Sequence, residues 1–369
     1  MPKLTLAVLF GGRSGEHEVS LMSARSVLEA LDKDKYQVFQ VGITHDGAWL
    51  TGDDVIGAFE RGDEASLSPA TVLPEPGDRS LYVRNGSTGF SRIADLDVVV
   101  PILHGTYGED GTIQGLFEMA ELAYVGAGVL ASAVAMDKGL FKWLMRAHGI
   151  PVLEFAIIDG SGLEGHIEAA LDKAEAVSEY PLFIKPANMG SSVGVSKVQN
   201  RADLVEGLMD ASQYDRRILV ERGIEAREIE LSVLGNENPE ASVPGEVIPS
   251  DEYYSYRAKY IDDQSELLIP APIDSETSEE ARRIAVEAYK AIDGAGMARV
   301  DMLLEKDTGR LYLNELNTVP GFTSISMYPK LWEASGLSYP ELMDRLIELA
   351  QARHKQKDKL VRTYKGAVS

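Results

Sequence analysis

Two short segments near the C-terminal end of the chain carry residue types that could bind a metal ion and an anion together. The first places Arg299 and Asp301 two residues apart, and the second places Glu315 and Asn317 two residues apart. Side chains with this spacing on a β-strand point to the same face of the sheet. Carboxylate and amide oxygens suit Mg²⁺ better than Zn²⁺, and a neighbouring arginine suits an anion. The four residues therefore predict a site for phosphoryl chemistry.

The sequence between these segments predicts a β-hairpin that brings them face to face. Residues 307–309 are typical of a three-residue loop, because Gly309 can adopt a positive φ. If Lys306 pairs with Arg310 across this loop, the two carboxylates lie directly opposite each other. Two carboxylates in that position repel, so a bound cation would favour keeping them. A surface hairpin with solvated charges is the alternative interpretation.

Two other loops after expected strands have the composition of binding loops. Residues 318–327 are rich in hydroxyls and contain Pro320 and Gly321, and they follow the second hairpin strand. Lys185 ends another strand and precedes a Gly/Ser loop over residues 187–194, whose N–H groups could approach phosphate oxygens. Its spacing differs from the Walker A and dinucleotide-binding patterns, so a plain β-hairpin is an equal alternative.

Near the N-terminus, Glu16 and His104 each lie in a loop that follows an expected buried strand. Ser14 or a neighbour could cap the next helix, and acidic residues at its start would complement the helix dipole. The functional interpretation is that Glu16 receives an ammonium group at the edge of the sheet. His104 at a strand end is equally consistent with a structural and a catalytic role.

Composition restricts the classes to which the chain can belong. It has 369 residues, 44% hydrophobic and 25% charged, which is typical of a globular protein of two or three domains. The net charge of −22 disfavours nucleic acid and anionic membranes as partners, and no apolar run approaches the ~20 residues of a membrane span. The absence of cysteine excludes disulfides and thiolate chemistry. With no signal- or transit-peptide pattern at the N-terminus, we expect a cytoplasmic protein.

Alternation of apolar strands with helices predicts an α/β fold that begins with a parallel sheet. The strands and helices expected in this first part are residues 4–10, 19–31, 38–43, 97–103 and 112–122. Residues 57–92 are rich in Gly, Pro and Ser and predict a surface excursion. One helix is expected over residues 131–148, with Lys138 inside it. Residues 244–266 predict a long loop of the kind that serves as a lid.

Together and in this order, the motifs resemble those of the D-alanine–D-alanine ligases of the ATP-grasp superfamily. They are Gly-Gly-x-Ser-x-Glu-His-Glu-Val-Ser, His-Gly-x-x-Gly-Glu-Asp-Gly-Thr-x-Gln-Gly, Met-Asp-Lys, Gly-Ser-Ser-x-Gly, Ala-Lys-Tyr, Arg-x-Asp and Glu-x-Asn-Thr-x-Pro-Gly. Each motif alone is weak, and the combination from Gly11 to about Ser326 is specific. The resemblance implies a Rossmann-like N-terminal domain at residues 1–126. It also implies an ATP-grasp fold made of residues 127–225 and 226–369.

The resemblance implies a role for each matching residue. Those implied to hold ATP are Lys138, Lys185, Ser191, Ser192, Glu221, Glu228 and Lys259, with Glu221 and Glu228 at the adenine and ribose. Those implied to bind two Mg²⁺ ions, or Mn²⁺ as a substitute, are Asp301, Glu315 and Asn317. Those implied to hold the two D-alanines are Glu16 and His104 for the first and Ser326 and Met327 for the second. Those implied in catalysis are Glu16, Ser191 and Tyr260 as a hydrogen-bonded set, Arg299 and the N–H of Gly321 as an oxyanion site, and Ser326.

The implied reaction makes D-alanyl-D-alanine for peptidoglycan through an acylphosphate, with release of ADP and phosphate. The resemblance also implies a homodimer and a monovalent cation as a further candidate cofactor. Two alternatives are a different carboxylate–amine ligase, including a D-alanine–D-lactate ligase, and a regulatory protein that only binds a nucleotide. Tyr260 favours the dipeptide product, because the depsipeptide-forming members replace this tyrosine. The complete set of metal ligands with Arg299 disfavours a protein that only binds.

Overall fold

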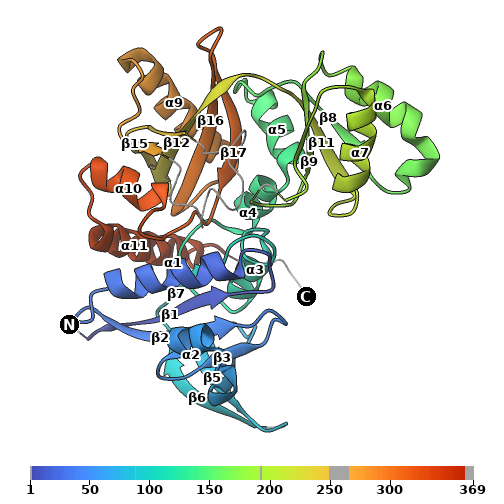
Figure 1. The fold of residues 1–369 in the computed structure, drawn as a ribbon. Coiled ribbons are helices and arrows are strands. Elements are labelled where there is room, and N and C mark those ends of the chain that lie inside the picture. The colour runs from blue at the N-terminus through green and yellow to red at the C-terminus, as the bar shows by residue number, and fades with distance from the viewer. Residues whose placement is uncertain (1, 88, 192, 249–265, 362–369) are drawn as a thin grey trace, which may run out of the picture.

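The structure is a computed structural model that describes residues 2–87, 89–191, 193–248 and 266–361. Three β-sheets follow one another along the chain, and helices pack on each of them (Figure 1). The α/β class expected from the alternation of strands and helices is confirmed. Within the described ranges, no helix is both long enough and apolar enough to cross a membrane.

The N-terminal sheet has seven strands in the order β6-β5-β4-β3-β2-β1-β7. They are β1 (Leu4–Gly11), β2 (Tyr36–Ile43), β3 (Trp49–Thr51), β4 (Ser68–Val72), β5 (Ser80–Asn85), β6 (Gly89–Asp95) and β7 (Val98–Ile102). Strand β1 pairs in parallel with β2 and β7, whereas the pairs from β2 to β6 are antiparallel. The sheet is therefore mixed, and the expected parallel order holds for its β2-β1-β7 part.

The expectation of a surface excursion over residues 57–92 was wrong. This segment contains most of helix α2 (Val55–Arg61) and then strands β4, β5 and β6, which extend the sheet. Gly62 ends the helix with a φ of 67°, and Gly86 turns the chain between two strands with a φ of 63°. Leu81 between these turns is fully buried. The density of turn residues obscured strands that are too short to show a clear alternation.

Helices cover both faces of the β2-β1-β7 part. Helices α1 (His17–Ala30) and α11 (Tyr339–Lys357) pack on one face, and α3 (Thr112–Met119) packs on the other. Alternate residues of β1 divide between these two cores, Leu6, Val8 and Phe10 on the first and Ala7 and Leu9 on the second. Figure 1 shows α11 beside α1, so the last helix of the chain packs on the first domain.

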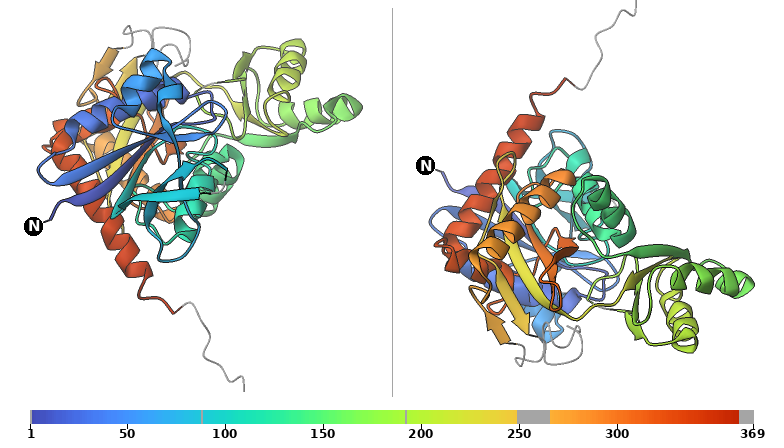
Figure 2. Two further views of the ribbon diagram at one scale, coloured as in Figure 1. Left: turned by 90° about the horizontal axis from the view of Figure 1, so that it is seen from below. Right: turned by 90° about the horizontal axis from the view of Figure 1, so that it is seen from above.

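The central sheet has the order β10-β9-β11-β8, and all of its strand pairs are antiparallel. Its elements are β8 (Phe155–Asp159), α6 (Ile167–Glu175), β9 (Leu182–Pro186), β10 (Ser196–Val198), α7 (Arg201–Ala211) and β11 (Arg217–Arg222). This unit projects to one side of the other two sheets (Figure 2). Strands β9 and β10 form a hairpin that is closed by the Gly/Ser loop, and this pairing is compatible with both interpretations of the segment.

The helix expected over residues 131–148 is two helices, α4 (Val129–Met136) and α5 (Lys138–Ala147). Asp137 separates them with a ψ of 97°, and its side chain accepts a hydrogen bond from the N–H of Leu140 at 2.8 Å. Aspartate thus acts as an N-cap that begins a second helix at Lys138. The N–H of Lys138 donates to the carbonyl of Ala187 at 3.0 Å, which ties the break to the Gly/Ser loop.

The C-terminal sheet has the order β15-β14-β12-β16-β17, with β13 on the outer end of β12. Its elements are β12 (Ala226–Leu234), β13 (Glu240–Ala241), β14 (Gly245–Ile248), β15 (Glu266–Leu268), α9 (Ser275–Ala291), β16 (Met297–Glu305), β17 (Leu311–Asn317) and α10 (Met327–Ala334). Helix α9 packs on one face through buried alanines and Tyr289. Strand β16 lies between β12 and β17, so the predicted hairpin has a central position in the sheet.

The hairpin places Asp301 opposite Glu315 and Arg299 opposite Asn317, as predicted. The amide of Asn317 donates to Asp301 at 3.1 Å, which confirms that these side chains share one face. Asp301 is only 9% exposed, which excludes for this residue the alternative of a surface hairpin with solvated charges.

Two differences from the expected ladder compensate each other. The N–H of Glu305 donates to the carbonyl of Arg310, so the loop holds residues 306–309 and is one residue longer than predicted. A β-bulge next to Asp301 then places one extra residue, Asn314, in β17 and restores the register. The predicted pairing at the site was therefore right although the predicted turn was wrong.

Candidate active site

Two cavities lie next to each other where the three sheets meet. The smaller, of about 50 Å³, is lined by residues that include Glu16, His104, Glu109, Arg299, Asn317 and Gly321. The larger, of about 230 Å³, is lined by residues that include Lys185, Glu221, Glu228, Glu230 and Asp301. Three residues, Lys138, Ser191 and Glu315, line both. Groups bound in the two cavities would meet at these three residues.

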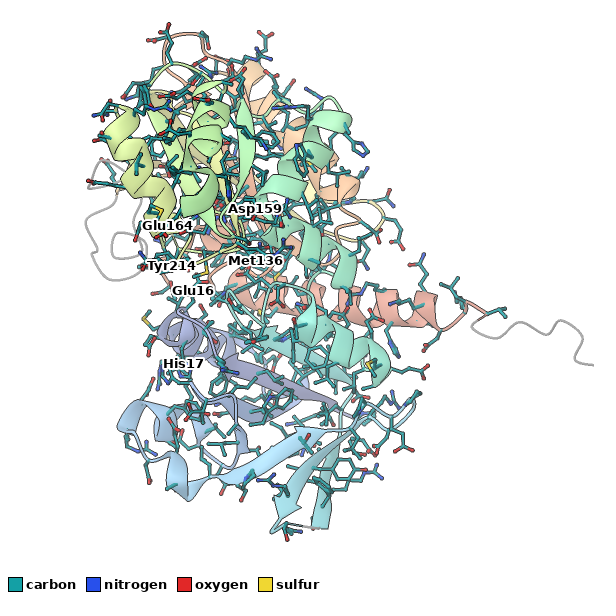
Figure 3. All side chains as sticks on the ribbon, turned by 90° about the vertical axis from the view of Figure 1, so that its right-hand side faces the viewer. Glu16, His17, Met136, Asp159, Glu164 and Tyr214 are labelled. Atoms are coloured by element: carbon teal, nitrogen blue, oxygen red, sulfur yellow. The ribbon has the colours of Figure 1, made fainter. Side chains whose placement is uncertain are left out.

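Glu16 lies at the start of α1, where the N-terminal domain faces the central unit (Figure 3). The hydroxyl of Ser191 in the Gly/Ser loop donates a hydrogen bond to its carboxylate. The backbones of Gly105 and Gly190 approach the same carboxylate so closely that a Cβ would come within 2.4 Å and 2.8 Å of it. A side chain at either position would displace the Glu16 carboxylate, and Gly105 also has a φ of 70° that favours glycine.

The loop around Ser191 and the entry to α1 both show local features of a functional site. Ser191 has a φ of 50°, an unfavourable value for a residue with a side chain, which is typical of positions held for function. Ser14 does not cap α1, because the N-cap residue is Glu16. The Ser14 hydroxyl instead accepts from the N–H of Glu16 at 3.2 Å and donates to the carbonyl of His104 at 2.9 Å. Ser14 thus joins two loops of the N-terminal domain.

The guanidinium of Arg299 lies between two carboxylates. Its Nε and Nη2 donate to both oxygens of Asp301 at 2.7 Å and 2.6 Å, and its Nε lies 3.1 Å from Glu230 on β12. This two-point contact fixes the plane of the guanidinium. Glu230 was not predicted, although its spacing two residues after Glu228 on a strand is the same signal that identified Asp301.

The predicted metal ligands form an oxygen-only set on this face. Asp301 faces Glu315 across the ladder, and Asn317 lies next to Asp301. Two carboxylates and an amide oxygen fit Mg²⁺. Within the described part of the chain, no cluster of three or more His, Cys, Asp or Glu side chains has a metal-binding arrangement. A metal here would therefore use the amide oxygen or ligands from outside the protein.

Lys138 reaches the point where the two cavities join. Its ammonium donates to the carbonyl of Met189 at 2.7 Å and lies 3.7 Å from the carboxylate of Glu315. The start of α5 at Lys138 explains this placement, because the helix break turns the residue towards the Gly/Ser loop. Met136, two residues earlier, lines the smaller cavity, and Figure 3 shows it near Glu16.

A buried cluster of Lys142, Lys185 and Glu221 borders the larger cavity. The two oxygens of Glu221 lie 2.5 Å from the ammonium of Lys142 and 2.8 Å from that of Lys185. Burial favours a neutral carboxyl, but the two ammonium groups outweigh it and hold the pKa of Glu221 at about 2. Lys142 is fully enclosed, whereas Lys185 also lines the cavity. Lys185 can therefore reach a ligand while Lys142 cannot.

His104 and Glu109 both bind the loop that follows β17. The ring Nδ1 of His104 lies 2.9 Å from the carbonyl of Val319, and Glu109 accepts from the N–H of the same residue at 3.1 Å. Glu109 also accepts from the N–H of Gly105 at 2.8 Å. Burial and the nearby charge of Glu16 raise the pKa of Glu109 to about 8, against the effect of these donors. Burial lowers the pKa of His104, which keeps the ring neutral.

Ser326 and Met327 lie at the start of α10. Ser326 is its N-cap residue, and its hydroxyl accepts from the N–H of Thr323 at 3.0 Å. The side chain of Met327 is buried in a small apolar core, so a ligand would reach its backbone N–H. The N–H groups at a helix start can bind a carboxylate. Neither residue lines the two cavities.

The structure brings together most, but not all, of the predicted site residues. Those that line one or both cavities are Glu16, His104, Lys138, Lys185, Ser191, Glu221, Glu228, Arg299, Asp301, Glu315, Asn317 and Gly321. Ser192, Lys259 and Tyr260 lie outside the described residues. Sequence reasoning missed Lys142, Glu109 and Glu230. Glu109 lies in the motif that contains His104 and could have been singled out there, whereas an enclosed lysine on a helix has no sequence signal.

Models of one protein family match most of this chain. The profile described as D-ala D-ala ligase N-terminus matches residues 5–127, and the one described as D-ala D-ala ligase C-terminus matches residues 144–348. The chain belongs to the D-Ala-D-Ala ligase family. Among curated relatives of this family member, the D-alanine–D-alanine ligases of Thermoanaerobacter sp. strain X514 and Heliobacterium modesticaldum are 53% and 50% identical. Each alignment covers 97% of this chain, and 99% and 98% of the relative.

Solved structures of the same family match the fold of this D-Ala-D-Ala ligase family member. The D-alanine-D-alanine ligase from Coxiella burnetii superposes with a TM-score of 0.82 at 37% identity, over 98% of both chains. The VanG D-Ala:D-Ser ligase from Enterococcus faecalis superposes with a TM-score of 0.84 at 35% identity, over 95% of this chain and 100% of the other. The predicted ATP-grasp fold is thereby confirmed, and the two enzymes are named for different second substrates.

Proposed function

We propose that this chain is an ATP-dependent ligase that joins two molecules of D-alanine to give D-alanyl-D-alanine, ADP and phosphate. The observation that carries the proposal is the pair of cavities that meet at Lys138, Ser191 and Glu315. The larger has the size and the lysines expected for a nucleotide, and the smaller has a carboxylate and an arginine for a small amino acid. A phosphoryl group could pass between them at the shared residues. Membership of the D-Ala-D-Ala ligase family supports the assignment.

In this proposal the larger cavity holds ATP. Lys138 and Lys185 bind its phosphates, aided by the hydroxyl of Ser191, and Glu228 binds the ribose. Glu221 was expected at the adenine, but both of its oxygens are paired with lysines, so we assign it to the orientation of Lys185. The role of Lys259 at the γ-phosphate and that of Ser192 at the nucleotide remain predictions from the sequence, because both residues lie outside the described part.

Asp301, Glu315 and Asn317 are proposed to hold two Mg²⁺ ions, and the same oxygen ligands would accept Mn²⁺. When bound, these ions neutralise charge on the phosphates during transfer. In the structure, Arg299 and Lys138 supply positive charge to Asp301 and Glu315. The same carboxylates would therefore face cations whether or not a metal is bound.

The chemistry follows from the presence of both Glu16 and Arg299 in the lining of the smaller cavity. Glu16 holds the ammonium of the first D-alanine, aided by the loop of His104, so that its carboxylate faces Arg299. Transfer of the γ-phosphoryl group to this carboxylate gives an acylphosphate and ADP. The amine of the second D-alanine loses its proton and attacks the carbonyl carbon. Arg299 and the N–H of Gly321 stabilise the oxyanion until the bond to phosphate breaks.

The second D-alanine needs a site of its own and a route that keeps water out. We propose that its carboxylate binds the N-terminus of α10 through Ser326 and the N–H of Met327, as helix starts bind anions. An acylphosphate hydrolyses in water, so the reaction requires a closed site. Tyr260 would complete the closure with Glu16 and Ser191, a role that rests on the sequence because Tyr260 lies outside the described residues.

The test is a balance of products. The chain incubated with ATP, Mg²⁺ and D-alanine should form D-alanyl-D-alanine, ADP and phosphate in equal amounts. Formation of AMP and pyrophosphate, or the absence of dipeptide, would contradict the proposal. ATP hydrolysis that does not require D-alanine would favour a protein that only uses the nucleotide.

A ligase for a different second substrate is the other candidate, because the chain also superposes on a structure titled as a D-Ala:D-Ser ligase. Both reactions share the acylphosphate step and differ in the nucleophile. Competition of D-alanine with D-serine, L-alanine and D-lactate, with the products separated by mass, distinguishes them. The sequence prediction from Tyr260 is that D-alanyl-D-alanine is the main product and that Tyr260→Phe raises the share of D-alanyl-D-lactate.

The assembly and setting of the enzyme are also proposals. We propose a homodimer in the cytoplasm, where ATP is available, with D-alanine as the partner and no binding to nucleic acid or membranes. Sedimentation equilibrium measures the mass of the assembly directly. A dependence of the rate on K⁺ at constant ionic strength would establish the monovalent cation as a cofactor.

A further inference from the structure

The loop after β17 is buried but belongs to no helix or strand, so its backbone needs other hydrogen-bond partners. Residues 318–323 are all buried. Pro320 has no N–H, and the N–H groups of Val319 and Phe322 on either side are bound by side chains. Among the described residues, the N–H of Gly321 has no protein partner, and Gly321 lines the smaller cavity. This is the group proposed above as an oxyanion donor.

Three side chains of the N-terminal domain hold this loop. Glu109 accepts from the N–H of Val319, and His104 contacts the carbonyl of the same residue. The N–H of Phe322 donates to the hydroxyl of Ser23 on α1 at 3.2 Å, and that hydroxyl lies 3.2 Å from Nε2 of His104. Both peptide groups that flank Pro320 and Gly321 are thus fixed from another domain.

The donors and acceptors of this network allow one arrangement of protons on a neutral histidine. A carbonyl can only accept, so Nδ1 of His104 carries the proton and donates to Val319. Nε2 must then accept, and Ser23 donates its hydroxyl proton to it. The hydroxyl oxygen remains free to accept from Phe322. The ring nitrogens of His104 and the hydroxyl of Ser23 are then all satisfied, which is expected for a buried polar network that defines one conformation.

We propose that Ser23, His104 and Glu109 are positioning residues that hold the loop of residues 319–322 so that the N–H of Gly321 faces the reacting carbonyl. His104 then acts through the loop and not by contact with D-alanine, because both ring nitrogens are already bonded within the protein. The inference rests on the proposed function, because the loop that these residues hold carries the N–H proposed as an oxyanion donor. It predicts that Ser23, which lines neither cavity, affects the rate.

Ser23→Ala is the sharpest test, because Ser23 is fully buried and lines neither cavity. The change leaves the N–H of Phe322 without its acceptor and removes the donor to His104. We expect kcat to fall about tenfold, which corresponds to about 1.4 kcal/mol and lies within the range for one unsatisfied buried group. The KM values for ATP and D-alanine should change less than twofold.

Ser242→Ala is the matched control. Ser242 is also buried, and its hydroxyl also accepts from a backbone N–H, that of Ser232 at 3.0 Å, while it donates to the carbonyl of Val243. It lines neither cavity. Its loss should lower stability about as much as Ser23→Ala does and leave kcat within twofold of wild type. Equal losses of kcat in both variants would overturn the proposal, because they would reflect stability alone.

A second pair of variants covers the case in which Ser23→Ala does not fold. His104→Asn places an amide N–H near the position of Nδ1 and can still donate to Val319, whereas His104→Leu cannot. We expect His104→Asn to keep several-fold more kcat than His104→Leu. Equal activity of the two variants, or a rise in KM for D-alanine with unchanged kcat, would overturn the positioning role and indicate direct substrate contact.

The outcome separates this proposal from the function on which it rests. If Arg299→Ala lowers kcat and Ser23→Ala does not, the positioning role is wrong and the oxyanion site stands. If neither variant lowers kcat while the dipeptide still forms, the oxyanion site is elsewhere and both assignments fail.

Discussion

The two cavities of the site are built in different ways. Around the larger cavity, charged side chains face each other, as in the contacts of Glu221 with Lys142 and Lys185. Around the smaller cavity, side chains of one domain bind the backbone of another, as His104 and Glu109 bind Val319. Ion pairs can exchange one partner for a charged ligand. Hydrogen bonds to a buried backbone cannot be exchanged without leaving a polar group unsatisfied.

This contrast fits the tasks proposed for the two sides. A nucleotide must enter and leave, and lysines that are already paired with carboxylates can transfer part of their interaction to phosphates. An oxyanion site works by being in place before charge develops, so its donors should not move. Changes on the larger cavity should therefore act on nucleotide binding, and changes on the smaller cavity should act on the rate of the chemical step.

The largest effect is expected from Arg299, which lines the smaller cavity. Arg299→Ala should lower kcat by roughly 10²–10³, the usual loss for one oxyanion donor, with a smaller change in KM for ATP. Arg299→Lys keeps the charge and loses the planar two-point contact with Asp301, so it should recover only part of the rate. Steady-state kinetics with both substrates measure the two parameters.

Arg227→Lys is the control for this prediction. Arg227 makes the same two-point contact with Glu246 in the same sheet, at 2.7 Å for both bonds, and it lines neither cavity. We expect its kcat to remain within twofold of wild type. A similar loss of kcat in Arg227→Lys and Arg299→Lys would show that the rate depends on the integrity of this sheet and not on stabilisation of the oxyanion by Arg299.

Glu315 lines both cavities and should therefore affect both binding and rate. Glu315→Gln should raise the Mg²⁺ concentration that gives half-maximal turnover by roughly 10–100-fold, the scale known for losses around metal sites. The free energy of unfolding without Mg²⁺ should change by less than about 1 kcal/mol. The variant loses the attraction between Glu315 and Lys138, but it also loses the repulsion between Glu315 and Asp301. Titration of the rate with Mg²⁺ is the measurement.

Glu225→Gln provides the control for the loss of one negative charge. Glu225 lies at the rim of the larger cavity, is exposed and is not part of the proposed metal set. Its Mg²⁺ titration should match that of wild type. An unchanged Mg²⁺ titration in Glu315→Gln would remove Glu315 from the metal ligands.

A substitution of Lys142 changes the charges beside the larger cavity without removing a residue that lines it. In Lys142→Met the whole charge of Glu221 acts on Lys185, which should hold that lysine away from phosphate and raise KM for ATP by about tenfold, or about 1.4 kcal/mol. The kcat at saturating ATP should change little. The double variant Lys142→Met/Glu221→Gln removes the excess charge and should recover most of the ATP affinity. If the double variant binds ATP no better than the single one, Glu221 does not control Lys185.

The smallest effect is a dependence of stability on pH. The pKa of Glu221 is about 2 in the folded chain, below the value of 4.5 for a free side chain. The stabilisation by its ionised form is complete above pH 4.5 and is lost as the pH falls towards 2. Between pH 4 and 3 this group alone should lower the free energy of unfolding by about 1 kcal/mol. The free energy of unfolding, measured with denaturant, should change less between pH 4 and 3 in Lys142→Met/Glu221→Gln than in wild type. An equal change in both proteins would contradict the assignment.

Local patterns were sufficient to predict the residues that face a common site. The pairs Arg299 with Asp301 and Glu315 with Asn317 were identified by spacing alone, because period-two alternation holds in any strand. The pairing between them was also right, although the loop is one residue longer and a bulge compensates for it. A turn can change its length without changing which residues face each other, provided that the strand corrects the register.

Predictions failed where the deciding interaction was not local. At the break between α4 and α5, the N–H of Lys138 donates to the carbonyl of Ala187 in another loop, and nothing in the apolar pattern of residues 131–148 marks this contact. The strands within residues 57–92 are short and depend on pairing with the rest of the sheet. Three of the side chains that bind the loop at residues 319–322 come from positions more than 200 residues earlier in the chain.

The sequence by itself determined the α/β class, the family, and the common face of Arg299, Asp301, Glu315 and Asn317, because these depend on residue types at short and constant spacing. Only the tertiary structure decided that Lys142 and Lys185 share Glu221. It also decided that Arg299 lies between Asp301 and Glu230, and that His104 binds Val319. The physical reason is that a buried charge or backbone group must find a partner wherever the fold brings one near. That partner has no fixed distance along the chain.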